Sequence, residues 1–230
     1  MGDNMGVPVL VMGFSGSGKS SSLRNFEKSE SGVFSVAGKR LPFRNALQVV
    51  DIEQKAYEFK SKNLAFQPYG YILGAIRSSS LNAFAIDDSQ YLMSFEEMDS
   101  TKTGYDKFNS IGFNFIGLVR AVRSQLSPNT IVYFLHHPEY DDNGRIKPKT
   151  IGKLIDNHFT LEGLFEVVVM AEYDKGDYVF RTRTDGATPF KNPPDMLPDI
   201  MPNDLKQVDS AIRDYWHMEP LTSTAGDDAQ

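Results

Sequence analysis

The sequence of 230 residues contains no cysteine. Disulfide bridges, zinc sites with cysteine ligands, iron–sulfur clusters and thiol catalysis are therefore excluded. Positive charge is also scarce, because 24 Lys and Arg residues stand against 30 Asp and Glu residues, which gives a formal net charge of −6. This balance excludes a uniformly basic surface for nucleic acid, although it leaves room for a local basic groove.

Long apolar runs are missing as well. The stretch from Phe165 to Ala171 is typical of the longest ones, and a membrane-spanning helix needs about 18 apolar residues. The N-terminal residues show no basic region followed by an apolar block, which is the pattern of a secretory signal peptide. We therefore expect a soluble, cytoplasmic protein with no membrane partner.

Short apolar runs alternate with helical patterns along the chain. Apolar residues make up 40 % of the sequence and charged residues 23 %, which is typical of a globular domain. The alternation predicts an α/β fold with a mostly parallel sheet and helices on both faces. The expected strands are residues 7–12, 33–36, 83–86 and 130–135, and residues 47–52 are a further candidate.

Helical periodicity is clearest from Tyr105 to Gln125, where apolar residues recur at spacings of three and four. This spacing predicts an amphipathic helix. Weaker patterns predict further helices over residues 19–26, 71–78 and 204–216.

The C-terminal third of the sequence has a different pattern. Residues 166–172 and 178–182 flank a turn signal and predict a late β-hairpin that extends the sheet at an edge. Residues 186–203 contain five prolines and are expected to be irregular. We expect a single domain over residues 1–216 and a disordered tail over residues 217–230.

Residues 13–20 read GFSGSGKS and match the phosphate-loop pattern G-x-x-x-x-G-K-[ST] at every fixed position. Glycines let such a loop wrap a phosphate with its N–H groups pointing inward, and the following helix adds its positive end. Lys19 would reach the β- and γ-phosphates of ATP or ADP, and the Ser20 hydroxyl would ligate Mg²⁺. The expected nucleotide-binding residues are Gly13, Ser15, Gly16, Ser17, Gly18, Lys19, Ser20 and Ser21.

Acidic and imidazole side chains follow two of the expected strands. The carboxyl ends of parallel strands share one edge of a sheet, so Asp87 can face Ser20 and support the metal. Asp88 could position or deprotonate the attacking water, or it could be a solvated loop acid. His136 or His137 could contact the γ-phosphate, or could be a histidine whose hydrogen bonds are satisfied at a strand end.

Several segments within and beyond the phosphate loop form a more specific pattern. They are residues 16–25 (GSGKSSSLRN), 36–43 (VAGKRLPF), 86–93 (IDDSQYLM), 104–108 (GYDKF), 143–145 (NGR), 149–156 (KTIGKLID) and 161–165 (LEGLF). With them the sequence resembles, over residues 7–205, a family of phage and prophage ATP-binding proteins. These are RecA-like P-loop ATPases associated with single-strand annealing and recombination.

The resemblance implies a RecA-type core, binding of ATP and Mg²⁺, and a role in phage DNA metabolism in the host cytoplasm. It carries Lys19 and Ser20 over as phosphate and metal residues and Asp87 as the metal-site acid. RecA-like enzymes usually have a catalytic Glu after the strand beside the phosphate loop. If residues 33–36 are that strand, no acid follows directly, and Glu53 is an alternative base if its own segment lies beside the loop.

One basic segment supports a nucleic-acid partner, and it consists of Arg145, Lys147, Lys149 and Lys153. These residues could hold DNA phosphates or reach the γ-phosphate of a neighbouring subunit, or they could be a solvated basic face. The favoured function is a homo-oligomeric ATPase that acts on single-stranded DNA. The alternatives are a small-molecule kinase, whose lid would need Arg181 and Arg183, and an assembly protein that binds ATP and hydrolyses little.

Overall fold

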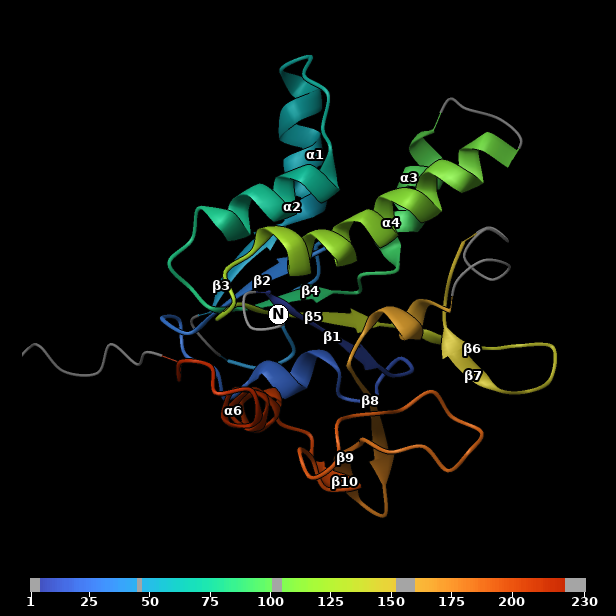
Figure 1. Cartoon of the computed structure of the whole chain (residues 1–230). Helices are drawn as coiled ribbons and strands as arrows, with labels where there is room; N and C mark the ends of the chain where they lie inside the picture. Colours follow the sequence, from blue (N-terminus) through green and yellow to red (C-terminus); the bar gives the residue numbers. More distant parts are fainter. Residues whose placement is uncertain (1–4, 45–46, 101–104, 152–159, 222–230) are drawn as a thin grey trace, which may run out of the picture.

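The computed structural model describes residues 5–44, 47–100, 105–151 and 160–221, so residues 222–230 of the expected tail lie outside it. One eight-stranded sheet runs through this part of the chain (Figure 1). Its strands are β1 (Val7–Met12), β2 (Ser31–Ser35), β3 (Gln48–Asp51), β4 (Ala83–Asp87), β5 (Ile131–His136), β8 (Val167–Asp174), β9 (Asp177–Arg181) and β10 (Ile200–Pro202).

The strand order is β10-β9-β8-β1-β5-β4-β2-β3. The six strands from β8 to β3 are parallel to one another. Beyond β8, β9 pairs antiparallel with β8, and β10 pairs antiparallel with β9. The expected α/β fold with a mostly parallel sheet is therefore confirmed, and β8 and β9 form the expected late hairpin.

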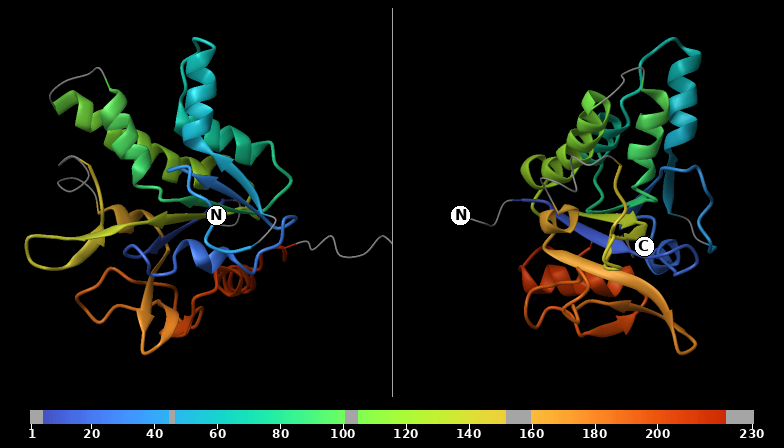
Figure 2. Two further views of the ribbon diagram at one scale, coloured as in Figure 1. Left: turned by 180° about the vertical axis from the view of Figure 1, so that it is seen from behind. Right: turned by 90° about the vertical axis from the view of Figure 1, so that its right-hand side faces the viewer.

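Helices cover both faces of the sheet (Figures 1 and 2). One face carries α1 (Ile52–Ser61), α2 (Pro68–Arg77), α3 (Tyr91–Asp99) and α4 (Tyr105–Gln125); the other carries the 3₁₀ turn η1 (Ser20–Leu23) and α6 (Leu205–Tyr215). A separate hairpin and a second 3₁₀ turn complete the described elements: β6 (Pro138–Tyr140), β7 (Ile146–Pro148) and η2 (Leu161–Leu164). No helix in the described ranges is long and apolar enough to span a membrane.

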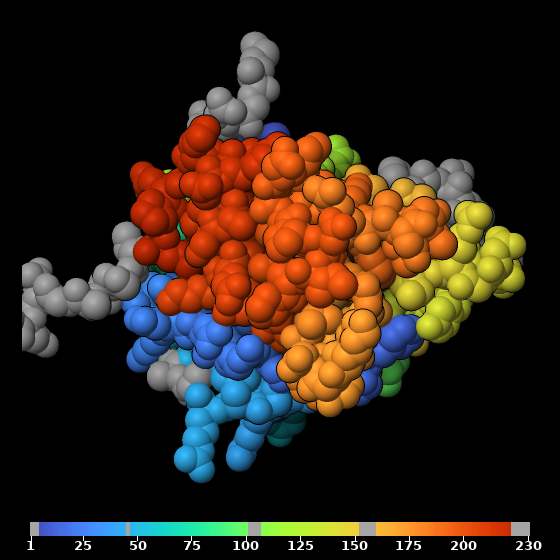
Figure 3. Space-filling view, turned by 90° about the horizontal axis from the view of Figure 1, so that it is seen from below, coloured from blue at the N-terminus to red at the C-terminus, as the bar shows by residue number. Residues whose placement is uncertain are grey.

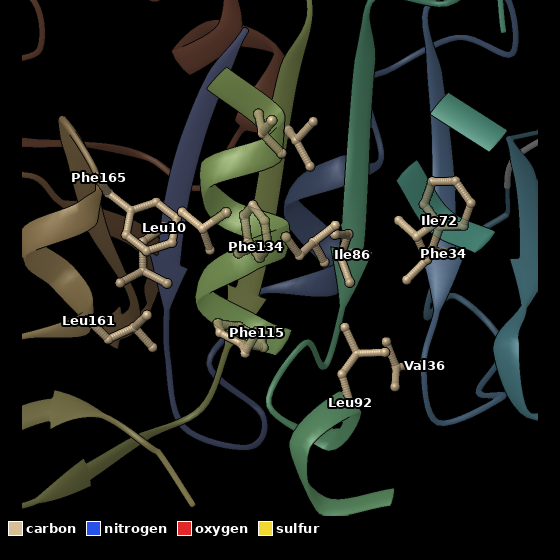
Figure 4. Close-up of a cluster of buried hydrophobic side chains, with 14 of the residues drawn as sticks. Leu10, Phe34, Val36, Ile72, Ile86, Leu92, Phe115, Phe134, Leu161 and Phe165 are labelled. Atoms are coloured by element: carbon tan, nitrogen blue, oxygen red, sulfur yellow. The ribbon is translucent and has the colours of Figure 1, made fainter. Parts of the chain in front are cut away.

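Consecutive strand residues enter two different cores, because side chains alternate between the faces of a sheet and both faces are covered. In β1, Leu10 joins the core beneath α2, α3 and α4, whereas Val9 and Val11 join the core beneath η1 and α6. In the first core (Figure 4), the rings of Phe115 and Phe134 pack edge to face with centroids 6.0 Å apart. This double burial explains why the strands are uninterrupted apolar runs.

The register of the parallel strands brings distant residues to one edge of the sheet. Met12 of β1 lies opposite His136 of β5, and Ser35 of β2 lies opposite Asp87 of β4. The loops that follow these strands therefore meet at the carboxyl edge, where open α/β sheets place their ligand sites.

Local structure departs from expectation after the phosphate loop. The helix expected over residues 19–26 is only the single turn η1. Serine hydroxyls compete with the backbone for hydrogen-bond partners, and the Ser22 hydroxyl donates to the Lys19 carbonyl. The structure therefore has one 3₁₀ turn where a helix N-terminus was expected behind the loop.

Other departures lie in segments with weak patterns. The ambiguous residues 47–80 contain β3, α1 and α2, and the expected helix there begins three residues earlier, at Pro68. The proline-rich residues 186–203 include the short strand β10, which pairs with β9 at the sheet edge. Proline is tolerated at such edges because a ladder hydrogen bond is not needed on the outer side.

A buried ion pair fixes α6 to the sheet. Arg213, which is 3 % exposed, pairs with Asp209 one helical turn earlier, and the Tyr133 hydroxyl of β5 donates to Asp209 at 2.8 Å. Arg213 also donates to the carbonyls of Asn82 at 3.0 Å and Asn129 at 2.9 Å, just before β4 and β5 begin. The helix is thus anchored at the amino edge of the sheet.

Trp216, the single tryptophan of the chain, follows α6 at that same edge. It lines a hollow of about 220 Å³ together with Gly6 and Val7, where β1 begins. Figure 3 views the molecule from the side of the sheet that carries α6. The chain from β8 onward, in orange to red, covers much of this side, beside the N-terminal segment in blue.

We expect Arg213→Leu to lower the free energy of unfolding by about 3–5 kcal/mol, because it leaves the Asp209 carboxylate buried without its counter-charge. Urea unfolding followed by circular dichroism measures the change. Lys55→Leu, which breaks the partly exposed pair with Glu58, serves as the control and should leave stability nearly unchanged. An Arg213→Leu protein as stable as the control would contradict the anchoring role.

Candidate functional site

The phosphate loop, residues 13–20, joins β1 to η1 and depends on its glycines. Gly16 and Gly18 have φ angles of +78° and +92°, a region that side chains disfavour. A Cβ atom on Gly13 would lie 2.3 Å from the Ser17 hydroxyl oxygen. Of the two fixed glycines of the motif, Gly13 is therefore required because a side chain would clash, and Gly18 because of its positive φ angle.

The Lys19 side chain folds back over its own loop. Its Nζ donates to the carbonyls of Gly13 at 2.6 Å and Phe14 at 3.1 Å, and the residue is 6 % exposed. Burial lowers the pKa of Lys19 to about 8, although the charges of Asp88 and Asp87 oppose this effect. The ammonium group is thus held by neutral acceptors that a charged phosphate oxygen would outcompete.

Ser20 and Asp87 meet across the site although 67 residues separate them. The Ser20 hydroxyl oxygen lies 2.8 Å and 3.0 Å from the two carboxylate oxygens of Asp87, to which it donates. Asp87 is 5 % exposed, and burial raises its pKa while the hydrogen bond from Ser20 opposes the rise. The structure therefore brings together the two side chains to which the sequence assigns the metal.

Asp88 is held by two donors. Its backbone lies in the left-handed region with φ +58°, and its carboxylate accepts hydrogen bonds from Lys39 Nζ at 2.7 Å and His137 Nε2 at 3.1 Å. Burial works to raise the pKa of Asp88, but the hydrogen bonds from His137 and Lys39 outweigh it and keep that pKa below its ordinary value. Asp88 is 7 % exposed, so it is not a solvated loop acid, and its low pKa makes it a weak proton acceptor.

The two histidines at the end of β5 have separate roles, because His136 is the last residue of the strand and His137 follows it. His136 is fully buried, with Nδ1 2.8 Å from the Ser89 hydroxyl and Nε2 2.7 Å from the Lys149 carbonyl. Burial lowers the pKa of His136 to about 4, so the ring is neutral and both nitrogens are engaged. Of the two histidines proposed as a phosphate contact, His136 thus has no ring nitrogen left for a ligand, and the geometry favours His137, which binds Asp88.

The strands beside β1 are β5 and β8. The strand expected at residues 33–36 is β2, which ends at Ser35, and the strand just before Glu53 is β3. Neither strand lies beside β1, as the catalytic-base predictions required. Glu53 lies in the first turn of α1, where a Cβ on Gly38 would be 3.2 Å from its carboxylate. It lines a hollow of about 810 Å³ between α1 and α3. The strand before Glu53 is not adjacent to β1, which was the condition for its proposed role as the base.

The basic segment lies on the β6–β7 hairpin and beyond it. Lys147 pairs with Glu139 at 3.2 Å, whereas Arg145 and Lys149 are exposed. Lys153 lies outside the described residues. Between residues 138 and 149 three basic residues are matched by three acidic ones, so the hairpin carries no net charge and offers little general attraction for DNA.

Two buried polar side chains at the loop have no hydrogen-bond partner among the described residues: the Ser17 hydroxyl and the Asn203 carboxamide. Ser17 is 8 % exposed and Asn203 is 1 % exposed. The side-chain amide atoms of Asn203 lie 3.3 Å from where a Cβ on Gly18 would be, and its backbone carbonyl accepts a hydrogen bond from Arg24 at 2.6 Å. Unpaired buried polar groups cost free energy, so the loop region fits an anionic ligand that supplies acceptors for such donors.

The chain matches no family model and no curated protein sequence. Geometry and charge at the site therefore carry the assignment of function. Lys39 and Asn203 were not among the residues expected from the sequence. Lys39 sits in the segment 36–43 that carries the resemblance, which is the signal that could have found it, whereas Asn203 stands in a proline-rich stretch without any motif.

The pKa of His136 predicts how stability depends on pH. The histidine pKa is about 6.5 in the unfolded chain and about 4 for His136 in the folded protein. Between these pH values the unfolded chain binds more protons, so acidification through this range lowers the free energy of unfolding. We expect this group to remove about 3 kcal/mol of unfolding free energy between pH 7 and pH 4.

Denaturant unfolding at a series of pH values measures this loss. His136→Gln should show a smaller decrease over that range than the wild-type protein, because glutamine does not titrate. His217→Gln, at an exposed position after α6, should keep the full decrease. An unchanged pH dependence in His136→Gln would show that another group is responsible.

Proposed function

We propose that this chain is a P-loop ATPase of the RecA-like type, which binds ATP with Mg²⁺ at the loop of residues 13–20 and hydrolyses it. The observation that carries the proposal is the hydrogen bond between the Ser20 hydroxyl and the Asp87 carboxylate, with Lys19 held alongside in the loop. A hydroxyl and a carboxylate beside a phosphate loop are the groups with which phosphoryl-transfer proteins hold Mg²⁺.

Mg²⁺, when bound, would neutralise charge on the β- and γ-phosphates. Lys19 would exchange the carbonyls of Gly13 and Phe14 for phosphate oxygens, which form stronger, charge-assisted hydrogen bonds. The Ser20 hydroxyl would turn its oxygen toward the metal, and its two-centred hydrogen bond to the Asp87 carboxylate would change accordingly. The unpaired Ser17 hydroxyl would find an acceptor in the phosphate.

The wider role that we propose is action on single-stranded DNA by a homo-oligomer in recombination or annealing, and it rests on the family resemblance. One structural feature adds support to this role: the exposed Tyr140 stacks on Phe14 of the loop, with ring centroids 5.6 Å apart. Exposed aromatic rings are the surfaces on which single-stranded bases stack. ATP turnover measured with and without single-stranded DNA tests this part of the proposal.

The kinase alternative has less support. Its lid would need mobile arginines, but Arg181 is paired with Glu172 and Asp174, and Arg183 is paired with Asp199 at 3.2 Å. Phosphate transfer to a nucleoside, measured over a panel of acceptors, would favour this alternative over hydrolysis.

We expect Lys19→Ala to weaken ATP binding about 10- to 100-fold, because a hydrogen bond from a charged donor is worth about 1.5–3 kcal/mol. Isothermal titration calorimetry with Mg²⁺ and ATP measures the affinity. The fold should be preserved, since the hydrogen bonds of Lys19 Nζ go to carbonyls of its own loop, those of Gly13 and Phe14. Lys28→Ala, at an exposed position, is the matched control, and equal affinity in both variants would refute the site.

We expect Asp87→Asn to weaken the Mg²⁺-dependent part of ATP binding and to abolish turnover, because an amide lacks the charge that supports the metal. Asp88→Asn should mainly slow turnover, since Asp88 contacts Lys39 and His137 and not Ser20. ATP affinity measured over a range of Mg²⁺ concentrations separates the two. Asp142→Asn, at an exposed position in the β6–β7 hairpin, is the control, and the reverse pattern would contradict the assignment.

A further inference from the structure

Lys39 brings a second ammonium group to the site. It follows β2 after the turn at Gly38, which has φ +61°, and the Ser35 hydroxyl donates to its carbonyl at 3.1 Å. Its Nζ donates to Asp88 at 2.7 Å and lies 5.6 Å from the ring centroid of Tyr91. The side chain is nevertheless 61 % exposed, so its charged end is held at the site and remains accessible.

The charge of Lys39 acts on the other groups of the site. Burial lowers the pKa of Lys19 most, and the charge of Lys39 adds to that effect. Burial raises the pKa of Asp87, and the charge of Lys39 is among the effects that oppose this rise. The geometry agrees with these effects, because Lys39 Nζ binds Asp88 at 2.7 Å and Asp88 directly follows Asp87, the partner of Ser20.

We propose that Lys39 is a catalytic cation that acts on the terminal phosphate within its own subunit, and that Asp88 positions it. This inference rests on the proposed ATP hydrolysis. In that step a water oxygen bonds to the γ-phosphorus and the bond from this phosphorus to the β–γ bridging oxygen breaks. ADP leaves with the electron pair, and the proton of the water passes to the released phosphate or to solvent.

A cation at the transferring group lowers the barrier of this step, because negative charge shifts onto the phosphoryl and leaving oxygens in the transition state. RecA-like ATPases commonly obtain such a cation from a neighbouring subunit, the role for which the sequence offered Arg145 and Lys153. Lys39 would supply one in cis, so the site combines a lysine from the loop with a lysine from the turn that follows β2.

Asp88 is suited to positioning. It is also bound by His137, so its carboxylate keeps a partner when Lys39 turns toward the phosphate. Lys39 would then exchange a singly charged partner for a multiply charged anion, to which its hydrogen bonds are stronger. The left-handed backbone of Asp88 fixes the carboxylate next to the turn that carries Lys39.

The competing explanation is that Lys39 only neutralises Asp88. The two explanations differ in what they predict for ligands. A structural partner would affect all nucleotides equally, or affect stability alone. A catalytic cation would strengthen the binding of a group that carries the charge of the transferring phosphate. Its removal would weaken binding of that group and leave the affinity for ADP unchanged.

The test compares Lys39→Met, Lys39→Arg and Arg40→Met, the last being an adjacent exposed residue that loses the same charge. Calorimetry measures affinity for ADP with Mg²⁺, and for ADP with Mg²⁺ and aluminium fluoride, which mimics the transferring phosphoryl group. We expect Lys39→Met to bind ADP normally and the mimic about 10- to 100-fold more weakly. Lys39→Arg should keep most of the affinity for the mimic, and Arg40→Met should match the wild type in both measurements.

Equal behaviour of Lys39→Met and Arg40→Met would overturn the inference while the proposed function stands, and so would an equal loss for ADP and the mimic. A wild-type protein that binds no nucleotide would overturn the proposed function and the inference together. Mixing Lys39→Met with Lys19→Ala tests action in cis, because each subunit then lacks one required lysine. No recovery of turnover supports Lys39 in cis, and partial recovery contradicts it.

Discussion

The bond between the Ser20 hydroxyl and the Asp87 carboxylate is the contact on which the site depends. A carboxylate buried at a strand end loses most of its hydration, and a single hydroxyl donor restores only part of that stabilisation. Its raised pKa is the sign of this shortfall. A divalent cation bound as proposed would complete the compensation, because its charge would replace the hydration that the carboxylate loses on burial. The glycines that place Ser20 and the sheet register that places Asp87 both serve this one contact.

Sequence was sufficient where burial or backbone geometry restricts the choice of residues. The phosphate loop requires glycine at two left-handed positions, and β4 requires a short apolar run before its acid. Helix α4 spans Tyr105–Gln125 as its periodicity predicted, since an amphipathic helix of this length has few alternative patterns. These features are local, and local patterns can be recognised without knowledge of the tertiary structure.

The order of the strands could not be predicted in the same way. Parallel strands are joined by crossovers, and nothing in residues 33–36 shows that β5 and β4 lie between them and the loop. The sequence also left open which of the two histidines faces the site, because β5 was expected to end at residue 135 and ends one residue later. The strand continues through His136, so that this side chain stays inside the fold and His137 is the first to leave it. Lys39 was missed for a related reason: the segment 36–43 marks its position, but its contact with Asp88 depends on the tertiary structure.

The single tryptophan determines how this protein can be observed. Trp216 lies near the start of β1, and the phosphate loop follows the end of the same strand. The six residues of β1 separate them by roughly 20 Å. Intrinsic tryptophan emission therefore reports the integrity of the α6 edge and is insensitive to events at the loop, so an optical titration needs a chromophore carried by the nucleotide itself.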